Sequence, residues 1–130
     1  MDPLTHTLVG ASLSATRLGQ KTRLATPALI IGANLPDIDV LSYLWGDDNA
    51  LAFRRGWTHG VPALVVLPAL LAVLLWLWGR GRDESDPGRR LSPGWLLALS
   101  YLACLTHPFL DWLNTYGMRW WMPFSDRWYY

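Results

Sequence analysis

The chain has 130 residues, of which 52% are hydrophobic and 16% charged, and its formal net charge is +1. This length suits one compact domain and is too short for two independent ones. So low a charged share is unusual in a soluble domain, and the near-neutral balance argues against a nucleic-acid-binding protein. Nine Trp and five Tyr residues favour a membrane protein, because amphipathic aromatic rings gather at membrane interfaces.

Four apolar segments predict four membrane-spanning helices, over residues 4–16, 26–45, 61–78 and 93–113. The first is rich in small residues that suit close helix packing, and the second carries Asp37 and Asp39. The third has no charged residue and roughly the length needed to cross a bilayer, and the fourth is uncharged until Asp111. We therefore expect an all-α integral membrane bundle of about four helices, forming a single membrane-embedded domain over residues 1–130.

The basic residues predict how this bundle is oriented. The two connections expected on one side carry Arg17, Lys21, Arg23, Arg80, Arg82, Arg89 and Arg90, and the opposite side carries Arg54, Arg55, Arg119 and Arg127. Seven basic residues against four place the first set in the cytoplasm, since Lys and Arg concentrate in cytoplasmic loops. This predicts a multi-pass protein of the bacterial inner membrane with both termini outside.

Each of the three histidines follows a threonine, in Thr5-His6, Thr58-His59 and Thr106-His107. A neighbouring hydroxyl can orient an imidazole or a carboxylate that binds a metal. Carboxylates are placed comparably: Asp37 and Asp39 follow Pro36, and Asp111 lies four residues after His107, on the same helical face. Ionisable residues inside apolar spans are costly, so their default interpretation is functional. The alternative is that the acids pair with arginines for stability.

The predicted topology brings these six residues to one side. His6 begins the first span, Asp37 and Asp39 lie in the outward half of the second, His59 begins the third, and His107 and Asp111 end the fourth. All six then lie opposite the basic connections, in the outer half of a hydrocarbon core about 30 Å thick or at its rim.

Mixed imidazole and carboxylate groups favour a divalent transition metal, Zn above all, with Mn or Fe(II) also suited. Six candidates exceed the four ligands of one zinc ion, so either two ions bind or some groups support ligands or take part in catalysis. The single cysteine, Cys104, is expected to be a packing residue.

Four motifs in order carry a family resemblance: Asp2-Pro3-Leu4-Thr5-His6, Leu35-Pro36-Asp37-Ile38-Asp39, Arg55-Gly56-Trp57-Thr58-His59 and Thr106-His107-Pro108-Phe109-Leu110-Asp111. Together they resemble the YbcI/YdjM-like family, described as LexA-regulated, membrane-bound metal-dependent hydrolases. The resemblance covers nearly the whole chain, up to Pro123-Phe124. It implies that the metal and catalytic positions are His6, Asp37, Asp39, His59, His107 and Asp111.

This chain departs from the family pattern in two ways. Many members carry a His where it has Arg54, which removes one possible ligand, and many continue well past Pro123-Phe124. The resemblance therefore implies a short or C-terminally truncated member.

The function expected is hydrolysis of a phosphoester or other ester of a lipid or lipid-linked substrate by metal-activated water. First-choice ligands are His6, His59, His107 and Asp111; Asp37 and Asp39 are ligands, a metal bridge or the general base. Arg54 and Arg55 could hold an anionic group of the substrate or serve as interface anchors. The alternatives are a haem-binding electron carrier, a transporter or proton relay, and a non-catalytic membrane scaffold whose metal ties helices together. The oligomeric state is not readable from the sequence.

Overall fold

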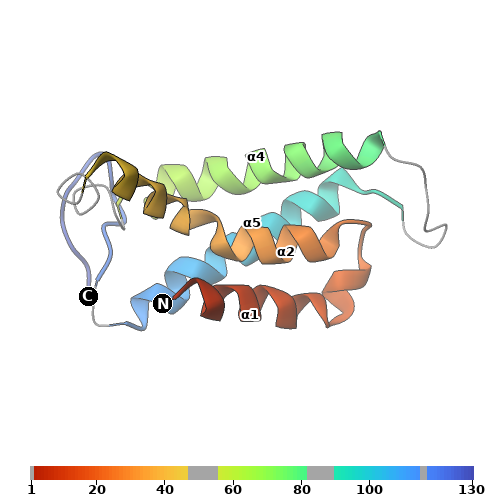
Figure 1. Cartoon of the computed structure of the whole chain (residues 1–130), viewed down its shortest axis with the longest axis horizontal. Coiled ribbons are helices and arrows are strands. Elements are labelled where there is room, and N and C mark those ends of the chain that lie inside the picture. The colour runs from red at the N-terminus through yellow and green to blue at the C-terminus, as the bar shows by residue number, and fades with distance from the viewer. Residues whose placement is uncertain (1, 47–55, 82–89, 115–116) are drawn as a thin grey trace.

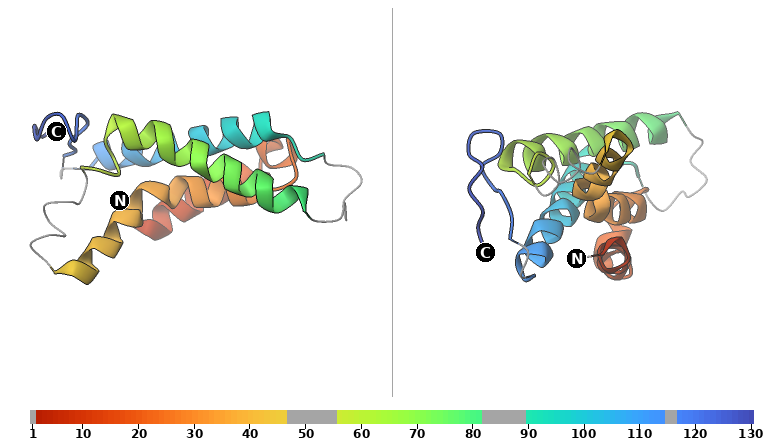
Figure 2. Two further views of the ribbon diagram at one scale, coloured as in Figure 1. Left: turned by 90° about the horizontal axis from the view of Figure 1, so that it is seen from above. Right: turned by 60° about the vertical axis from the view of Figure 1, so that its left-hand side comes forward.

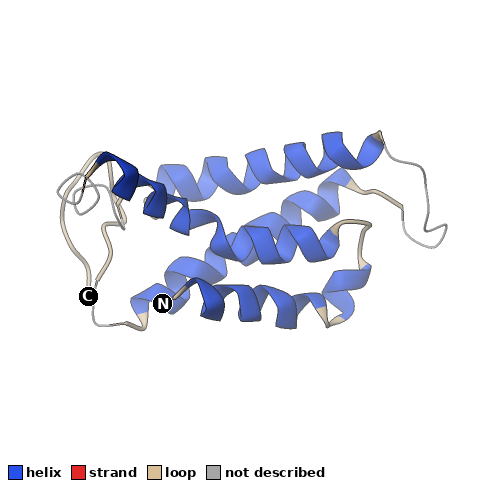
Figure 3. Cartoon of the chain, viewed as in Figure 1, coloured by secondary structure: helices blue, strands red, loops and turns tan. Residues whose placement is uncertain are grey.

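The computed structural model describes residues 2–46, 56–81, 90–114 and 117–130. The α-helices there are α1 (Pro3–Ser14), α2 (Ala25–Asn34), α4 (Val61–Arg80) and α5 (Pro93–Trp112), and the 3-10 helices are η1 (Arg17–Gln20) and η2 (Leu35–Trp45) (Figure 1). Across the described ranges there is no β-strand, only an isolated bridge between Met118 and Tyr129 (Figure 3). The all-α prediction is confirmed, and the four predicted segments match α1, α2 with η2, α4 and α5.

Local signals in the sequence set where the helices begin. Asp2 caps α1 by accepting hydrogen bonds from the Thr5 backbone N–H at 3.0 Å and the Thr5 hydroxyl at 2.8 Å. The bond from the Thr5 hydroxyl, and to a lesser extent the bond from its backbone N–H, hold the pKa of the Asp2 carboxyl below its usual range. A proline occupies the first turn of α1, α4 and α5, where its missing N–H costs nothing.

The helices pack around α2, which lies between α1 and α5, while α4 covers another side of α5 (Figure 2). The shared core contains Ala28, Leu29, Leu71, Leu96 and Leu99. At Gly10 a Cβ atom would lie 2.6 Å from the Leu29 carbonyl oxygen, so α1 and α2 approach at backbone distance. This is the close packing expected from the small residues of the first segment.

The exterior of the bundle is apolar, whereas the buried set includes ionisable groups. On α4 the side chains of Val65, Val66, Leu70 and Leu74 are each more than half exposed, while three histidines and two aspartates are buried. A soluble domain shows the opposite distribution, and a surface this apolar is suited to lipid.

Helix length limits how many segments can be assigned to the membrane. In the described part of the chain, only α4 is long and apolar enough to cross a bilayer by itself. The 12 residues of α1 rise about 18 Å, well short of a core about 30 Å thick. Of the four predicted membrane spans, the structure therefore supports the one at α4, and the other three stay a prediction.

A side-chain hydrogen bond joins α4 to α5. Pro68 lies inside α4, where it donates no backbone hydrogen bond and crowds the carbonyls of the preceding turn. The Tyr101 hydroxyl of α5 donates to the carbonyl of Val65 in that turn at 2.5 Å. The Val65 carbonyl is next to the Leu64 carbonyl, which Pro68 leaves without its usual N–H donor, so the bond from Tyr101 ties the disturbed turn of α4 to α5.

The two predicted basic connections meet at one end of the molecule. The Thr22 hydroxyl donates to the Arg90 carbonyl at 3.1 Å and accepts from the Ser92 N–H at 2.8 Å, and the Arg23 guanidinium donates to the Gly79 carbonyl. Both chain ends lie at the other end of the bundle (Figure 1).

Candidate metal centre

The six predicted residues come from four segments of the chain. His6 lies on α1, Asp37 and Asp39 on η2, His59 in the turn that precedes α4, and His107 and Asp111 on α5. His6, Asp39, His59, His107 and Asp111 are at most 2% exposed. Asp37 is more open, with its side chain 17% exposed.

Two histidines and one aspartate form the centre of the cluster. The Nε2 atoms of His59 and His107 lie 3.1 Å apart, and each is 3.5 Å from Oδ2 of Asp111. Ligands about 2.0–2.1 Å from a tetrahedral zinc ion lie about 3.3–3.4 Å from each other. The three atoms therefore have the mutual spacing of ligands around one small cation.

The surroundings of His107 fix its tautomer. Its Nδ1 lies 2.7 Å from the carbonyl oxygen of Ala33 on α2. A carbonyl only accepts hydrogen bonds, so Nδ1 carries the ring proton and Nε2 presents its lone pair. This is the form that binds a metal.

The tautomer of His59 is also fixed by its surroundings, here by the hydroxyl of Thr58. Thr58 Oγ1 donates to Oδ2 of Asp39 at 3.2 Å and lies 3.0 Å from Nδ1 of His59. Because the hydroxyl proton is directed at the carboxylate, the hydroxyl oxygen accepts from Nδ1–H, which leaves the lone pair on Nε2. Two lone pairs facing each other at 3.1 Å repel unless a cation lies between them.

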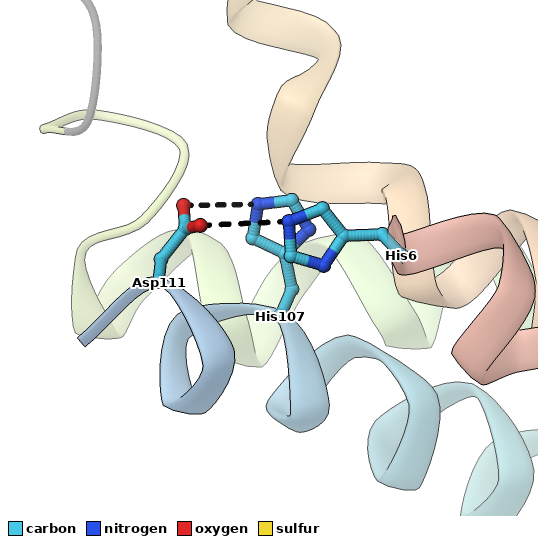
Figure 4. A group of neighbouring side chains, drawn as sticks. All are labelled: His6, His107 and Asp111. Carbon is cyan, nitrogen blue, oxygen red and sulfur yellow. Dashed lines mark ion pairs between the residues drawn. The ribbon is translucent and has the colours of Figure 1, made fainter. Parts of the chain in front are cut away.

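His6 approaches the other oxygen of Asp111. Its ring stacks on that of His107, with centroids 3.6 Å apart and planes 18° apart, and its Nε2 is 3.5 Å from Oδ1 of Asp111. Figure 4 shows the two oxygens of Asp111 directed at the two rings. Neither nitrogen of His6 has a hydrogen-bond partner among the described residues, although both are buried.

Asp37 closes the cluster on its more exposed side. Its Oδ1 is 3.5 Å from Nε2 of His107. Its Oδ2 is buried and has no hydrogen-bond partner in the part of the chain that the structure describes. Besides the set His59, His107 and Asp111, two overlapping groups have ligand atoms close enough to hold a metal ion: His6, His107 and Asp111, and Asp37, His59 and His107.

Comparison with known proteins identifies the family. The model of the YdjM inner membrane protein family matches residues 1–130, the whole chain. The chain belongs to the YdjM inner membrane protein family. It is 31% identical to "Inner membrane protein YbcI" of Escherichia coli (strain K12), over 95% of this chain and 68% of that protein. It is 29% identical to "Uncharacterized protein YfhP" of Bacillus subtilis (strain 168), over 98% of this chain and 39% of that protein.

Membership of the YdjM family associates the chain with the lipid bilayer and supports an inner-membrane location. The chain spans less than two thirds of YfhP and just over two thirds of YbcI. No solved structure matches it.

The six positions that the sequence singled out in this family member do converge, but they are not equivalent. Asp39 lies at Nδ1 of His59 and belongs to neither metal group found among the described residues, whereas Asp37 belongs to one. Arg54 and Arg55, expected to bind substrate, lie outside the described residues. Cys104 is fully buried in α5, as expected of a packing residue.

The sequence alone missed one supporting group. The Ala33 carbonyl could not be foreseen, because it belongs to a different helix. Of the three threonines next to histidines, only Thr58 contacts its histidine, since the hydroxyls of Thr5 and Thr106 bond to Asp2 and to the Ala103 carbonyl.

Proposed function

We propose that the protein is a membrane-bound metal-dependent hydrolase whose ion is held by His59, His107 and Asp111. The observation that carries this proposal is the convergence of the two Nε2 lone pairs and Oδ2 of Asp111 within 3.5 Å of one another in a buried site. Without an ion, the cluster would leave facing lone pairs and a carboxylate buried together, which is costly.

The donor set selects the type of metal. Two imidazoles and a carboxylate suit zinc, and they also accept manganese or ferrous iron, whereas Mg and Ca prefer all-oxygen shells. A zinc ion supplies Lewis acidity, which polarises an ester oxygen and brings the pKa of a water toward neutrality.

Asp37 is the proposed general base. Its Oδ1 lies next to His107, and its Oδ2 has no hydrogen-bond partner among the described residues. Oδ2 is therefore available to accept a proton from the attacking water, on the side of the cluster that is partly exposed. Asp39 has a different role, because it contacts Thr58 and holds His59 in the tautomer that binds metal.

His6 defines where a second ion would bind. Its Nε2 faces Oδ1 of Asp111, while Oδ2 of the same carboxylate faces His59 and His107. One carboxylate could thus bridge two ions, as in other two-metal hydrolytic sites. The group His6, His107 and Asp111 shares His107 and Asp111 with the first position, so we expect the first ion to bind more tightly.

The proposed substrate is an ester of a lipid or of a lipid-linked molecule. The apolar exterior and the inner-membrane family support this choice, because such substrates reach the site laterally through the bilayer. Arg54 and Arg55, close to His59 in the sequence, are proposed to hold the anionic part, since Arg binds phosphate in a bidentate manner. We further propose that the site faces the extracytoplasmic side in a four-span topology, because the described basic residues Arg17, Lys21, Arg23, Arg80 and Arg90 belong to the opposite end.

A second candidate function is a structural metal site that only fastens helices. The near-complete burial of His6, His59, His107 and Asp111 favours it, because structural sites are closed whereas catalytic sites keep a position open. The partial exposure of Asp37 favours the hydrolase. Haem binding is disfavoured, since the rings of His6, His59 and His107 contact one another and leave no space for a porphyrin between them.

The test combines metal analysis with an ester-hydrolysis assay on detergent-purified protein. The parent should bind transition metal and release phosphate or head group from at least one of a panel of phospholipids and polyprenyl phosphates. Asp37→Asn should keep the metal and lose about a hundredfold or more in rate, the effect of removing a general base. If the parent binds metal but hydrolyses no ester, the structural function stands and the hydrolase is refuted.

A further inference from the structure

An apolar pocket lies beside the metal cluster, between the start of α1, the end of α2 and η2. It encloses about 490 Å³, within the range of small-molecule binding sites. Its walls are formed by Pro3, Ile30, Ile31, Leu35, Ile38 and Leu41. Several of these side chains are exposed, so the pocket opens on the outer surface of the bundle. Figure 2 shows η2 continuing from α2 and leading away from α4.

Among the described residues that line this pocket two are polar, and they differ in what they offer. Asn34 uses both N–H groups of its amide inside the protein, donating to the Thr7 hydroxyl at 3.0 Å and to the Ile30 carbonyl at 2.9 Å. Asp37 also lines the pocket, and its Oδ1 lies 3.5 Å from Nε2 of His107. The polar part of the pocket is therefore continuous with the metal cluster, and the rest is hydrocarbon.

This arrangement fits an amphiphile with one polar end and one apolar chain. None of the described residues that line the pocket is basic, so this part of its wall offers no partner for an acidic peptide or for a second anionic group. We propose that the pocket receives a hydrocarbon chain of the lipid substrate, placing the ester next to Asp37 and the metal cluster. This inference rests on the proposed hydrolase function and adds the site of the chain and the side from which the substrate enters, between α1 and η2.

A second apolar hollow provides a matched control. It encloses about 260 Å³ and is lined by Ala72, Val73, Trp76, Pro93, Gly94 and Leu97, none of which belongs to the metal cluster. Lipid that merely surrounds the protein should contact both hollows and the exposed face of α4 alike. A bound substrate chain should favour the pocket at η2.

The first experiment locates the chain by photo-crosslinking. The protein is placed in bilayers of phosphatidylethanolamine and phosphatidylglycerol that contain a phosphatidylglycerol with a diazirine at the end of one acyl chain. After irradiation, mass spectrometry should find more label on residues 30–41 than on α4. Ile38→Trp, which fills the pocket, should abolish this excess, and Val73→Trp should leave it unchanged. Label spread evenly over η2 and α4 would overturn the proposal and identify surrounding lipid alone.

The second experiment measures hydrolysis by the same variants. Ile38→Trp and Leu41→Trp should lower kcat/KM for a long-chain substrate about tenfold, and they should retain activity on a water-soluble analogue with a short acyl chain. Both side chains are about half exposed, so the variants should fold, and unchanged metal content verifies this. Equal losses on both substrates, with metal retained, would contradict a chain-binding role.

The two experiments separate failure of the pocket from failure of the hydrolase. Selective labelling of η2 in a protein that cleaves no ester would leave the lipid-binding pocket standing and refute the hydrolase. Hydrolysis with even labelling would leave the hydrolase and refute the pocket. If η2 is labelled in this protein but not in longer family members, a further chain segment covers the pocket in those members instead of lipid. That result would also refute the chain-binding pocket.

Discussion

Replacing Asp39 by Asn tests whether the buried relay to His59 controls metal binding. In the native protein Thr58 Oγ1 directs its proton at Oδ2 of Asp39, and its oxygen accepts from Nδ1–H of His59. An Asn side chain can turn its NH₂ group toward Thr58, which reverses the hydroxyl and makes it donate to Nδ1. The ring proton then moves to Nε2, where it blocks the ligand atom that faces His107.

The expected magnitude follows from the position of Asp39, whose Oδ2 accepts from the Thr58 hydroxyl and lies 3.5 Å from Nδ1 of His59. Residues that orient a metal-binding histidine change metal affinity by about 10- to 100-fold, equivalent to about 1.4–2.8 kcal/mol. Asp39→Asn should therefore weaken the Kd for zinc by that factor, whereas Asp37→Asn should lose rate and retain metal. Thr58→Val should resemble Asp39→Asn, and Thr58→Ser, which keeps the hydroxyl, should restore tight binding.

The assay is competition for zinc against a chromogenic chelator, with detergent-purified protein at fixed pH. Ser42→Ala is the matched control, because the buried Ser42 hydroxyl donates to the backbone carbonyl of Asp39 and does not contact His59. It should leave zinc affinity unchanged. Native affinity in both Asp39→Asn and Thr58→Val would refute the relay as a determinant of zinc binding.

The other predictions address the ligands, the packing and the orientation. Elemental analysis of the double variant His107→Ala/Asp111→Ala should find most transition metal lost, and full occupancy would remove α5 from the site. Gly10→Ala should lower the free energy of unfolding by about 1–3 kcal/mol, and the Tm with it, because its Cβ would lie 2.6 Å from the Leu29 carbonyl oxygen. Gly94→Ala, which has open space around it, should cause no such loss in a thermal melt. In a Cys104→Ala background, an impermeant thiol reagent should label Phe124→Cys but not Gly81→Cys in intact cells, and the reverse pattern would place the site in the cytoplasm.

The positions of the helices followed from the sequence because apolar runs are local signals. Runs ending near Trp45 and Trp112 correspond to η2 and α5, and Pro3, Pro62 and Pro93 lie in the first turns of their helices. The number of membrane-spanning helices was harder to predict, because a run of apolar residues does not show how long its helix is. In the second segment, for instance, α2 ends at Asn34 and the chain continues as a 3-10 helix.

The proximity of the six residues could also be predicted, because buried ionisable groups are rare and the topology brought them to one side, whereas their binding of a metal stays a prediction. Their individual roles could not. Asp37 and Asp39 have the same chemistry two residues apart, and only the geometry of η2 directs one toward Nε2 of His107 and the other toward Nδ1 of His59. Likewise, the repeated Thr-His pairs suggested three equivalent hydroxyls, but helix capping by Asp2 engages Thr5.

The bond from Tyr101 to the Val65 carbonyl sets the axial register of two antiparallel helices. His107 follows Tyr101 by six residues on α5, about 9 Å along that helix, and His59 precedes Val65 by six residues, in the turn before α4 begins at Val61, so both histidines lie in the same direction from the bond. Sliding α4 along α5 by one residue would shift the facing nitrogens by about 1.5 Å, a large change for a 3.1 Å separation. The Tyr101 side chain, remote from the cluster, therefore helps to keep the imidazoles of His59 and His107 at the same height along the two helices.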